Sequence, residues 1–549
     1  MTTATIPTTW TTGSTEVFRT GTWRAALPLH VHAPSPCHQA CPLGGEIAEW
    51  IGHARARDFR AAWDVLTRHN PFPAIAGRIC HHPCEAACNR GAHDEALSIC
   101  RLERFVGDMG IAQGWRFAPP PAPRDGHVAV IGAGPAGLSA AFQLRRRGWR
   151  VTVFEASAEP GGLMRHGIPS YRLARDVLDA EIARLVDLGV RIRCSEPLGD
   201  AAQFERLRAT HDAVFVATGA ARVKRLPALD YALPGVMDGA AYLAACNAGT
   251  PPALGRDVVV IGGGSAALDA ARSARRQGHT VAVLALESRA QLPAQREEVD
   301  EALEEGIALM DGAMLVALHS GARGLVLQCR RVNFMPGAVR GEFRIEPIEG
   351  SDFALHADAV LSSIGQDPEL APFGSALQAQ GSLLGADARS QATATAGVWA
   401  GGDVASAERF VTAAIGMGRR AALAIHRHLA GEPAGDAEEG APVALSSIAT
   451  WYHEDAARVR VANVPVDRRL REGTEVQLGL DIEQALAEGA RCFSCGTCIT
   501  CDNCVAVCPD LAVRRVGDGY EVLVDYCKGC GLCVRECPTG SMTMLEERR

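Results

Sequence analysis

The feature that most constrains this chain is a strand–glycine–helix–strand unit at residues 128–155. An apolar run leads into Gly132, Gly134 and Gly137 in the spacing G-x-G-x-x-G, and a second strand delivers Glu155. In such a unit the glycines allow a tight turn, close approach of a pyrophosphate, and helix–strand packing. The helix N-terminus attracts the phosphates, and the acid accepts hydrogen bonds from ribose hydroxyls. The pattern predicts a dinucleotide site; a glycine-rich turn in another α/β protein is the alternative.

A second copy of this pattern begins near residue 258. Gly262, Gly264 and Ala267 give the spacing G-x-G-x-x-A, which the fingerprint allows, and the following strand ends at Glu287. A duplicated structural unit is the alternative to a second binding site. We expect two dinucleotides, a flavin that stores electrons and a nicotinamide that delivers hydride.

Cysteines are concentrated in two parts of the chain. Sixteen of the nineteen fall in residues 37–100 or 492–537, and the other three, Cys194, Cys246 and Cys329, are expected in the core. Clustering at C-x-x-C spacing, without a signal-peptide pattern, favours metal ligands in a reducing compartment over disulfides. We therefore expect a cytoplasmic protein.

The strongest metal signal is the spacing C-x2-C-x2-C-x3-C-P, which occurs twice after residue 497. In two-cluster ferredoxins with this pattern, the fourth cysteine of each run ligates the cluster of the other run. Two [4Fe–4S] clusters are predicted in this C-terminal region, one on Cys498, Cys501, Cys504 and Cys537, the other on Cys508, Cys527, Cys530 and Cys533. Cys492 and Cys495 continue the rhythm upstream, as spare thiols or as an alternative ligand set.

The N-terminal cysteines predict a separate iron–sulfur region. They flank helical segments expected at 45–56 and 58–69, and thiolates four residues apart can face one way on a helical turn, as cluster ligation needs. Buried free cysteines are one alternative; zinc is another, although the spacing is not that of common zinc modules. The cysteines concerned are Cys37, Cys41, Cys80, Cys84, Cys88 and Cys100.

Charge and composition exclude other classes. The net charge of −8 argues against a general nucleic-acid role, and no run of about 20 apolar residues predicts a membrane span. No Ser-His-Asp set, paired-carboxylate site or cysteine nucleophile emerges, so we expect no catalytic side chain and assign the chemistry to the cofactors.

Together the motifs resemble the small subunit of NAD(P)H-dependent glutamate synthase and its relatives. Those relatives include the flavin module of dihydropyrimidine dehydrogenase and the larger subunit of NADH-dependent ferredoxin:NADP oxidoreductases. The resemblance covers about residues 30–430 and rests on CP, GRIC, CEAAC, GGLMRHGIP, ATG, AGGD and the two fingerprints. It implies an α/β flavoprotein with two Rossmann-like domains, preceded by a helical iron–sulfur domain. The C-terminal cysteine runs add a ferredoxin-like α+β domain after it.

The resemblance also implies domain boundaries, with the second nucleotide unit inserted in the first. We expect a helical iron–sulfur domain at 1–118, an FAD-binding domain at 124–250 and 355–432, an NAD-binding domain at 251–354, a linker at 433–485 and a two-cluster ferredoxin-like domain at 486–549.

Cofactor contacts follow from the same resemblance. Asp403 would meet the ribityl or pyrophosphate part of FAD, and Glu287 the nicotinamide cofactor. The candidate cofactor-binding residues are Gly132, Gly134, Pro135, Ala136, Gly137, Glu155, Gly161, Gly162, Leu163, Thr218, Gly219, Gly262, Gly264, Ser265, Ala266, Glu287, Gly365, Gly402, Asp403 and Thr412.

The N-terminal region departs from the family pattern. Relatives usually carry C-x2-C-x4-C-x3-C-P there and hold two clusters, whereas the first two positions fall in the LHVH region of this chain and hold no cysteine. We therefore expect one [4Fe–4S] cluster there, with Cys37 and Cys88 as remnants or substitutes. Cys100, one helical turn before Glu103, is an alternative to that acid. The ligands carried over from relatives are Cys41, Cys80, Cys84 and Glu103.

The acid after the second fingerprint predicts a preference for NAD(H) over NADP(H). Glu287 can bind the ribose hydroxyls and would repel a 2′-phosphate. NADPH-using relatives carry an arginine pair where this chain has Leu286 and Glu287. Arg289 lies nearby and could instead reach such a phosphate.

These parts predict an electron-transfer flavoprotein. A flavin connects two-electron nicotinamide chemistry to one-electron clusters. The electrons would pass between NADH and the iron–sulfur centres of a ferredoxin or of a partner enzyme in a larger complex, such as a 2-oxoacid:ferredoxin oxidoreductase or a sulfite-reductase-type enzyme. A glutamate synthase small subunit and a non-catalytic iron–sulfur scaffold are the alternatives.

Overall fold

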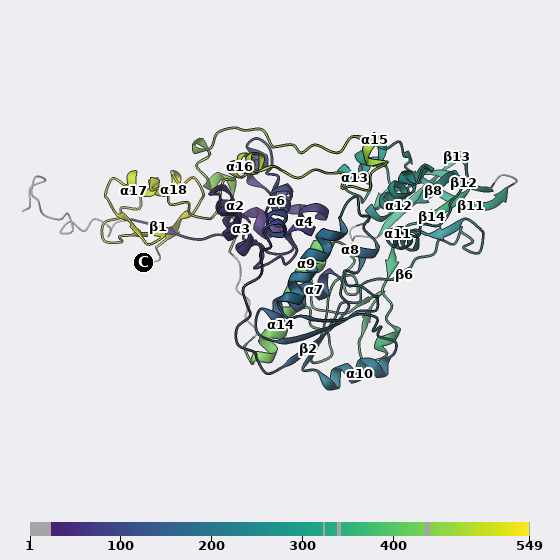
Figure 1. The fold of residues 1–549 in the computed structure, drawn as a ribbon. Coiled ribbons are helices and arrows are strands. Elements are labelled where there is room, and N and C mark those ends of the chain that lie inside the picture. Colours follow the sequence, from purple (N-terminus) through teal and green to yellow (C-terminus); the bar gives the residue numbers. More distant parts are fainter. Residues whose placement is uncertain (1–23, 322–323, 338–341, 434–439, 548–549) are drawn as a thin grey trace, which may run out of the picture.

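The computed structural model describes residues 24–321, 324–337, 342–433 and 440–547. Figure 1 shows an N-terminal group of helices at the centre of an elongated upper layer. The C-terminal domain lies on one side of these helices and the second nucleotide domain on the other, while the first nucleotide domain lies below. The N-terminal helices therefore occupy the middle of the molecule.

The first nucleotide domain is built on a parallel sheet in the order β18-β5-β2-β3-β4. Except for the edge strand β4, its strands are mainly apolar, as expected where helices cover both faces of a parallel sheet. Helix α7 (Pro135–Arg145) follows the first fingerprint and packs along α14 (Val411–Ala430). The strands are β2 (His127–Ile131), β3 (Arg150–Phe154), β4 (Arg191–Arg193), β5 (Ala213–Val216) and β18 (Val398–Ala400).

The second nucleotide domain lies in the sequence between β5 and β18. Its parallel sheet has the order β10-β9-β8-β14-β7, and an antiparallel sheet β11-β12-β13 packs beside it. The strands of the two sheets are β7 (Val236–Asp238), β8 (Asp257–Ile261), β9 (Thr280–Leu284), β10 (Ala308–Met310), β14 (Ala359–Ser362), β11 (Ala313–Gly321), β12 (Gly324–Pro336) and β13 (Phe343–Ala357). The helices used below are α11 (Gly239–Asn247), α12 (Ser265–Arg276) and α13 (Arg296–Glu304).

The N-terminal domain is helical because its apolar residues recur at three and four positions, and its core holds Trp50 and Trp63. Two glycines let α4 and α6 cross at backbone contact. A Cβ on Gly77 would lie 2.3 Å from the Arg104 nitrogen, and one on Gly107 would lie 2.3 Å from the Ala74 nitrogen. The helices are α1 (Pro36–Ala40), α2 (Ile47–Arg55), α3 (Phe59–Leu66), α4 (Pro73–Ile79), α5 (Pro83–Ala86) and α6 (Ile99–Ala112).

The C-terminal domain contains the hairpin β19 (Val513–Val516) and β20 (Gly519–Val522), with short helices α17 (Asn503–Ala506) and α18 (Leu532–Arg535). Its last strand, β21 (Met542–Glu546), pairs antiparallel with β1 (Ala26–His30), so opposite ends of the described chain share one sheet. Three α/β or α+β units with an N-terminal helical domain confirm the expected fold class.

Residues 440–495 connect the first nucleotide domain to the C-terminal domain and run back over the N-terminal helices (Figure 1). Helix α16 (Ile482–Ala490) begins with a capping box and packs against α2 and α6. We refer to residues 440–481 as the strap, because their polar groups bond to several domains.

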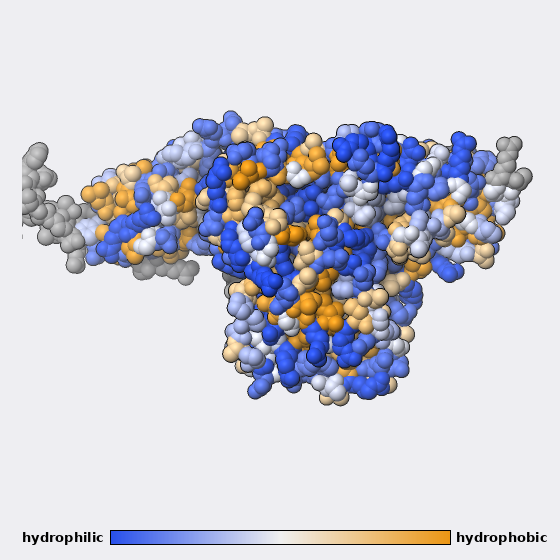
Figure 2. Space-filling model, viewed as in Figure 1, coloured by the Kyte–Doolittle hydropathy of each residue, from blue (hydrophilic) through white to orange (hydrophobic). Residues whose placement is uncertain are grey.

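Polar residues cover most of the face seen in Figure 2, with hydrophobic residues gathered where the central and lower parts meet. None of the helices in the described ranges combines the length and hydrophobicity that a membrane span requires.

Candidate functional site

The first fingerprint forms an open cradle at the N-terminus of α7. Gly132 has a φ of +106°, and a Cβ there would lie 2.4 Å from the Ala217 carbonyl oxygen. A Cβ on Gly137 would lie 1.9 Å from the Gly132 oxygen, whereas one on Gly134 would meet nothing within 4 Å. Close packing therefore needs Gly132 and Gly137, while Gly134 leaves space for a phosphate at the positive end of the helix.

Glu155 lies just beyond β3, and its carboxylate is fixed by two backbone donors. Its Oε2 accepts from the Ala133 nitrogen at 2.7 Å and its Oε1 from the Ser157 nitrogen at 2.8 Å. The side chain is buried beside the glycine turn. An acid held in this way can present its outer lone pairs to ribose hydroxyls.

The other candidate FAD contacts collect around this cradle. The Gly161 nitrogen donates to the Ala133 oxygen at 2.9 Å, and a Cβ on Gly162 would lie 2.9 Å from the Gly134 Cα. These contacts come from this loop, from the segments after β5 and β18, and from the starts of α7 and α14. They are Pro135, Ala136, Gly161, Gly162, Leu163, Thr218, Gly219, Gly402, Asp403 and Thr412. Burial raises the pKa of Asp403, and Arg409, 4.0 Å away, opposes that rise. Gly365, by contrast, follows β14 in the second domain.

The second fingerprint repeats the geometry of the first. Gly262 has a φ of +134°, and a Cβ there would lie 2.4 Å from the Ser363 oxygen, while Gly264 again faces open space. Ser265 and Ala266 begin α12. A Cβ on Gly263 would lie 2.7 Å from Glu287 Oε2, so this carboxylate lies against the glycine turn.

Glu287 and Arg289 differ in how available they are. Strand β9 ends at Leu284, three residues before Glu287, where the sequence predicts the end of the strand. Glu287 lies in the turn that follows, where burial raises its pKa. The Arg289 guanidinium lies 2.9 Å from Asp300 Oδ1, and its backbone nitrogen donates to Asp311. The carboxylate therefore lies against the glycine turn, while the exposed arginine pairs with Asp300 at the surface.

Two small cavities in the C-terminal domain are lined by the predicted cluster ligands. One, with an empty volume of about 280 Å³, is lined by Cys498, Cys501, Cys504 and Cys537. The other, of about 300 Å³, is lined by Cys508, Cys527, Cys530 and Cys533. Each cavity takes its fourth cysteine from the other run, which is the exchange that the two-cluster pattern predicts.

Cys41, Cys80 and Cys84 lie near Glu103 in the N-terminal domain. Burial raises the pKa of Cys80 to about 12, with Glu103 and Cys41 adding to the rise, and burial raises the pKa of Glu103 to about 7. Asn70 donates to Glu103 at 2.7 Å. The Cys100 thiol instead donates to the Gly77 oxygen at 3.4 Å. Thiols and a carboxyl group gathered in one buried site can ligate an iron–sulfur cluster once metal binding has displaced their protons.

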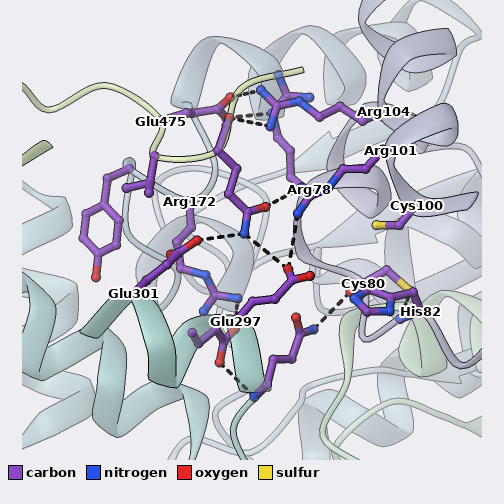
Figure 3. Close-up of a pocket in the computed structure, with 15 residues that line it drawn as sticks. Arg78, Cys80, His82, Cys100, Arg101, Arg104, Arg172, Glu297, Glu301 and Glu475 are labelled. Atoms are coloured by element: carbon purple, nitrogen blue, oxygen red, sulfur yellow. Dashed lines mark hydrogen bonds and ion pairs between the residues drawn. The ribbon is translucent and has the colours of Figure 1, made fainter. Parts of the chain in front are cut away.

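Figure 3 shows a polar groove where the N-terminal helices, α13 and the strap meet. Glu475 of the strap accepts from Arg78 at 2.7 Å and from Arg104 at 2.8 Å. Arg101 lies 3.2 Å from Glu297 of α13. The charges of this groove are largely paired with one another, so it is a junction between domains rather than a substrate pocket.

A further thiol-lined cavity was not predicted from the sequence. It is formed by Cys37 and Cys88 of the N-terminal domain together with Cys492 and Cys495, which follow α16. The available sequence signal was the C-x-x-C spacing of the last two, but nothing in the sequence places them beside the N-terminal helices.

Three family descriptions match the chain. Residues 126–418 match the pyridine nucleotide-disulphide oxidoreductase family, which covers more than half of the chain. Residues 30–115 match the dihydropyrimidine dehydrogenase domain II, 4Fe-4S cluster family, and residues 497–542 match the 4Fe-4S dicluster domain.

Curated relatives cover most of the chain. The NADP(+)-dependent formate dehydrogenase subunit beta of Moorella thermoacetica is 34% identical over 86% of this chain and 72% of its own length. The NAD-dependent dihydropyrimidine dehydrogenase subunit PreT of Escherichia coli K12 is 32% identical over 72% of this chain and 92% of its own. The glutamate synthase [NADPH] small chain of Mycobacterium tuberculosis is 34% identical over 72% of this chain and 86% of its own.

Proposed function

We propose that this chain, which belongs to the pyridine nucleotide-disulphide oxidoreductase family, passes electrons between NADH and the iron–sulfur centres of a ferredoxin or partner enzyme. The chain is an NAD(P)H-dependent flavin and iron–sulfur electron-transfer oxidoreductase. Its resemblance to glutamate synthase small subunits is confirmed.

The observation that carries the proposal is the position of Cys80 at the meeting point of three domains. Its Sγ lies 3.6 Å from Thr412 Oγ1 at the start of α14, in the first nucleotide domain. Its carbonyl oxygen accepts from Gln295, just before α13 of the second nucleotide domain, at 3.0 Å. A candidate cluster ligand is therefore in direct contact with both nucleotide-binding domains.

The residues fit the cofactors they would hold. Gly134 and Gly264 leave open the space that a pyrophosphate would fill at each helix N-terminus. Glu155 would orient a ribose of FAD, and Glu287 a ribose of NADH. A bound flavin would supply the exchange between two-electron hydride and one-electron clusters. We assign the remaining candidate residues to these roles. We take the second nucleotide domain to run from β7 to β14, a longer span than the 251–354 expected from the sequence.

We also propose that the chain is a subunit of a larger enzyme. The formate dehydrogenase, dihydropyrimidine dehydrogenase and glutamate synthase relatives are all described as subunits or chains. The ferredoxin-like domain, which exposes Cys501 and Cys530, would face the electron partner. A 2-oxoacid:ferredoxin oxidoreductase or a sulfite-reductase-type enzyme fits such a domain.

A glutamate synthase small subunit is the second candidate, favoured by the mycobacterial relative. That role does not need a two-cluster C-terminal domain. If glutamine and 2-oxoglutarate stimulate NAD(P)H oxidation by the chain with its co-purified partner, this second function replaces the first.

The test is NADH-driven reduction of methyl viologen by the anaerobically purified holoprotein. We expect flavin bleaching followed by dye reduction. If NADH and NADPH both leave the flavin oxidised, the chain is a scaffold rather than an oxidoreductase.

A further inference from the structure

The cavity lined by Cys37, Cys88, Cys492 and Cys495 has no role in the function proposed above. Its other lining residues are mainly apolar and include Ile47, Ile51, Leu97 and Phe493. Its empty volume is about 370 Å³, against about 300 and 280 Å³ for the two cysteine-lined cavities of the C-terminal domain. In volume and in number of thiols it resembles those two cluster sites.

The spacing of the sulfurs distinguishes a cluster from a single metal ion. Tetrahedral zinc, with Zn–S bonds of about 2.3 Å, holds its sulfurs about 3.8 Å apart. Among the described residues, no three of these four sulfurs lie within 4.8 Å of one another. The same is true of the ferredoxin-type cysteines in the C-terminal domain. The four thiols surround a space larger than one ion.

Hydrogen-bond donors point at several of these sulfurs. Asn89 Nδ2 lies 3.5 Å from Cys495 Sγ, and the Ser494 nitrogen donates to Cys492 Sγ at 3.4 Å. The Ser35 hydroxyl lies 3.1 Å from Cys37 Sγ. Such donors stabilise charge on thiolate sulfur and tune the potential of a cluster.

A buried ionic junction holds the two halves of the site together. Arg491, next to Cys492, pairs with Asp94 at 3.1 Å, and the Arg90 guanidinium donates to the Arg491 oxygen at 2.8 Å. Glu488 of α16 accepts from the Ser98 nitrogen at 2.7 Å. Both arginines and Glu488 are buried, so Cys492 is fixed against the N-terminal domain.

Two pairs of neighbouring cysteines in the N-terminal domain are each shared between the Glu103 site and the new cavity. Cys37 lies four residues before Cys41, and Cys88 four residues after Cys84, so each pair gives one thiol to the Glu103 site and one to the new cavity. The relatives have a C-x2-C pair at the start of the N-terminal region that this chain lacks. Cys492 and Cys495 have the same spacing as that pair.

From this geometry we propose that Cys37, Cys88, Cys492 and Cys495 ligate a further [4Fe–4S] cluster, shared between the N-terminal domain and the segment after α16. The chain would then hold four clusters, not the three predicted from the sequence. The new cluster would lie next to the Glu103 site. It would carry electrons between that site and the clusters of the C-terminal domain. The proposal does not depend on which nicotinamide or partner the protein uses.

The first test counts clusters in the unmutated, anaerobically reconstituted full chain. We expect about sixteen iron and sixteen sulfide per chain, and four cubane clusters by Mössbauer spectroscopy. A count of about twelve iron, or stoichiometric zinc, overturns the proposal. This count decides the question even if a variant fails to fold.

The second test uses a double variant, Cys492→Ser with Cys495→Ser, which removes both of the ligands that follow α16. We expect a loss of about four iron, with flavin content retained. Cys37→Ser with Cys88→Ser should lose the same four, and all four substitutions together no more. Cys194→Ser with Cys246→Ser is the matched control and should lose none. Unchanged iron in the first variant, or additive losses in the fourfold variant, would contradict a shared cluster.

Discussion

Glu287 is a single residue whose charge is expected to set the choice of nicotinamide. Its carboxylate lies against the Gly263 turn, where it can accept from ribose hydroxyls and repel a 2′-phosphate. We predict that NADH is preferred by about 5–150-fold in kcat/KM, which corresponds to about 1–3 kcal/mol. Glu287→Arg should reduce or invert this ratio in the methyl viologen assay.

Asp300→Ala is the matched control for this prediction, because it frees Arg289 from its partner. We expect it to change the NADH/NADPH ratio little. A kcat/KM for NADPH that equals or exceeds that for NADH in the unmutated protein would contradict the role given to Glu287.

Glu305 makes the stability of the second nucleotide domain depend on pH. It is buried and accepts from Arg272 and Arg276, each at 2.7 Å, and these partners lower its pKa to about 2. Because the folded-state pKa lies below the usual value of about 4.5, the stabilisation is present above pH 4.5 and is lost as the pH falls toward 2. It amounts to about 3 kcal/mol.

Glu305→Gln should destabilise this domain by about 3–5 kcal/mol near neutral pH, because Arg276 then loses its carboxylate partner and Arg272 keeps only Glu301. Hydrogen exchange in α12 should be faster in this variant and should change less between pH 5 and pH 3 than in the unmutated protein. The control is Glu304→Gln: this neighbour pairs with Arg469 but is half-exposed, so its effect should be small. Equal exchange in both variants would show that the buried pair is not stabilising.

At the scale of the helix, the crossing of α4 and α6 fixes the distance between Cys80 and Glu103. Gly77→Ala would place a Cβ 2.3 Å from the Arg104 nitrogen and push the helices apart. We predict a loss of about 1–3 kcal/mol and of about four iron per chain, measured by thermal unfolding and iron analysis.

Gly52→Ala on α2 is the control for the helix crossing, because a Cβ there meets nothing within 4 Å. A helix-interior alanine should stabilise this domain by about 0.5–1 kcal/mol and leave the iron content unchanged. If Gly77→Ala behaves in the same way, the crossing does not hold the ligands in place.

At the scale of the whole molecule, the order of the domains predicts what truncation removes. Deleting residues 497–549 should remove about eight iron atoms and abolish transfer to a protein partner, while NADH still bleaches the flavin. Deleting residues 486–549 should remove about four more, because Cys492 and Cys495 go as well. Unchanged iron after the shorter deletion would show that the ferredoxin-type assignment is wrong.

Sites formed by residues in a recognised spacing motif could be predicted from the sequence. The site formed by cysteines about 400 residues apart in the sequence, without such a motif, could not. Each glycine spacing acts within one turn, and each C-x2-C-x2-C-x3-C-P run specifies both its own three ligands and the one it exchanges with the other run. The structure brings the residues of each pattern together at one cradle or cavity. The meeting of Cys88 with Cys492 depends on the path of the strap and on the ionic contacts of Arg491. Spacing carries no information about such a path, and Cys492 therefore had no assigned role.

The pairing of β1 with β21 has a consequence for the order in which the protein is made. Ala26 pairs with Glu546 and His30 with Met542, so during synthesis β1 leaves the ribosome long before its partner strand exists. Until then its backbone donors and acceptors are open to other strands. The pairing of β1 with β21 therefore has to wait until residue 546 has left the ribosome, and a nascent chain that stalls before residue 542 keeps an aggregation-prone edge.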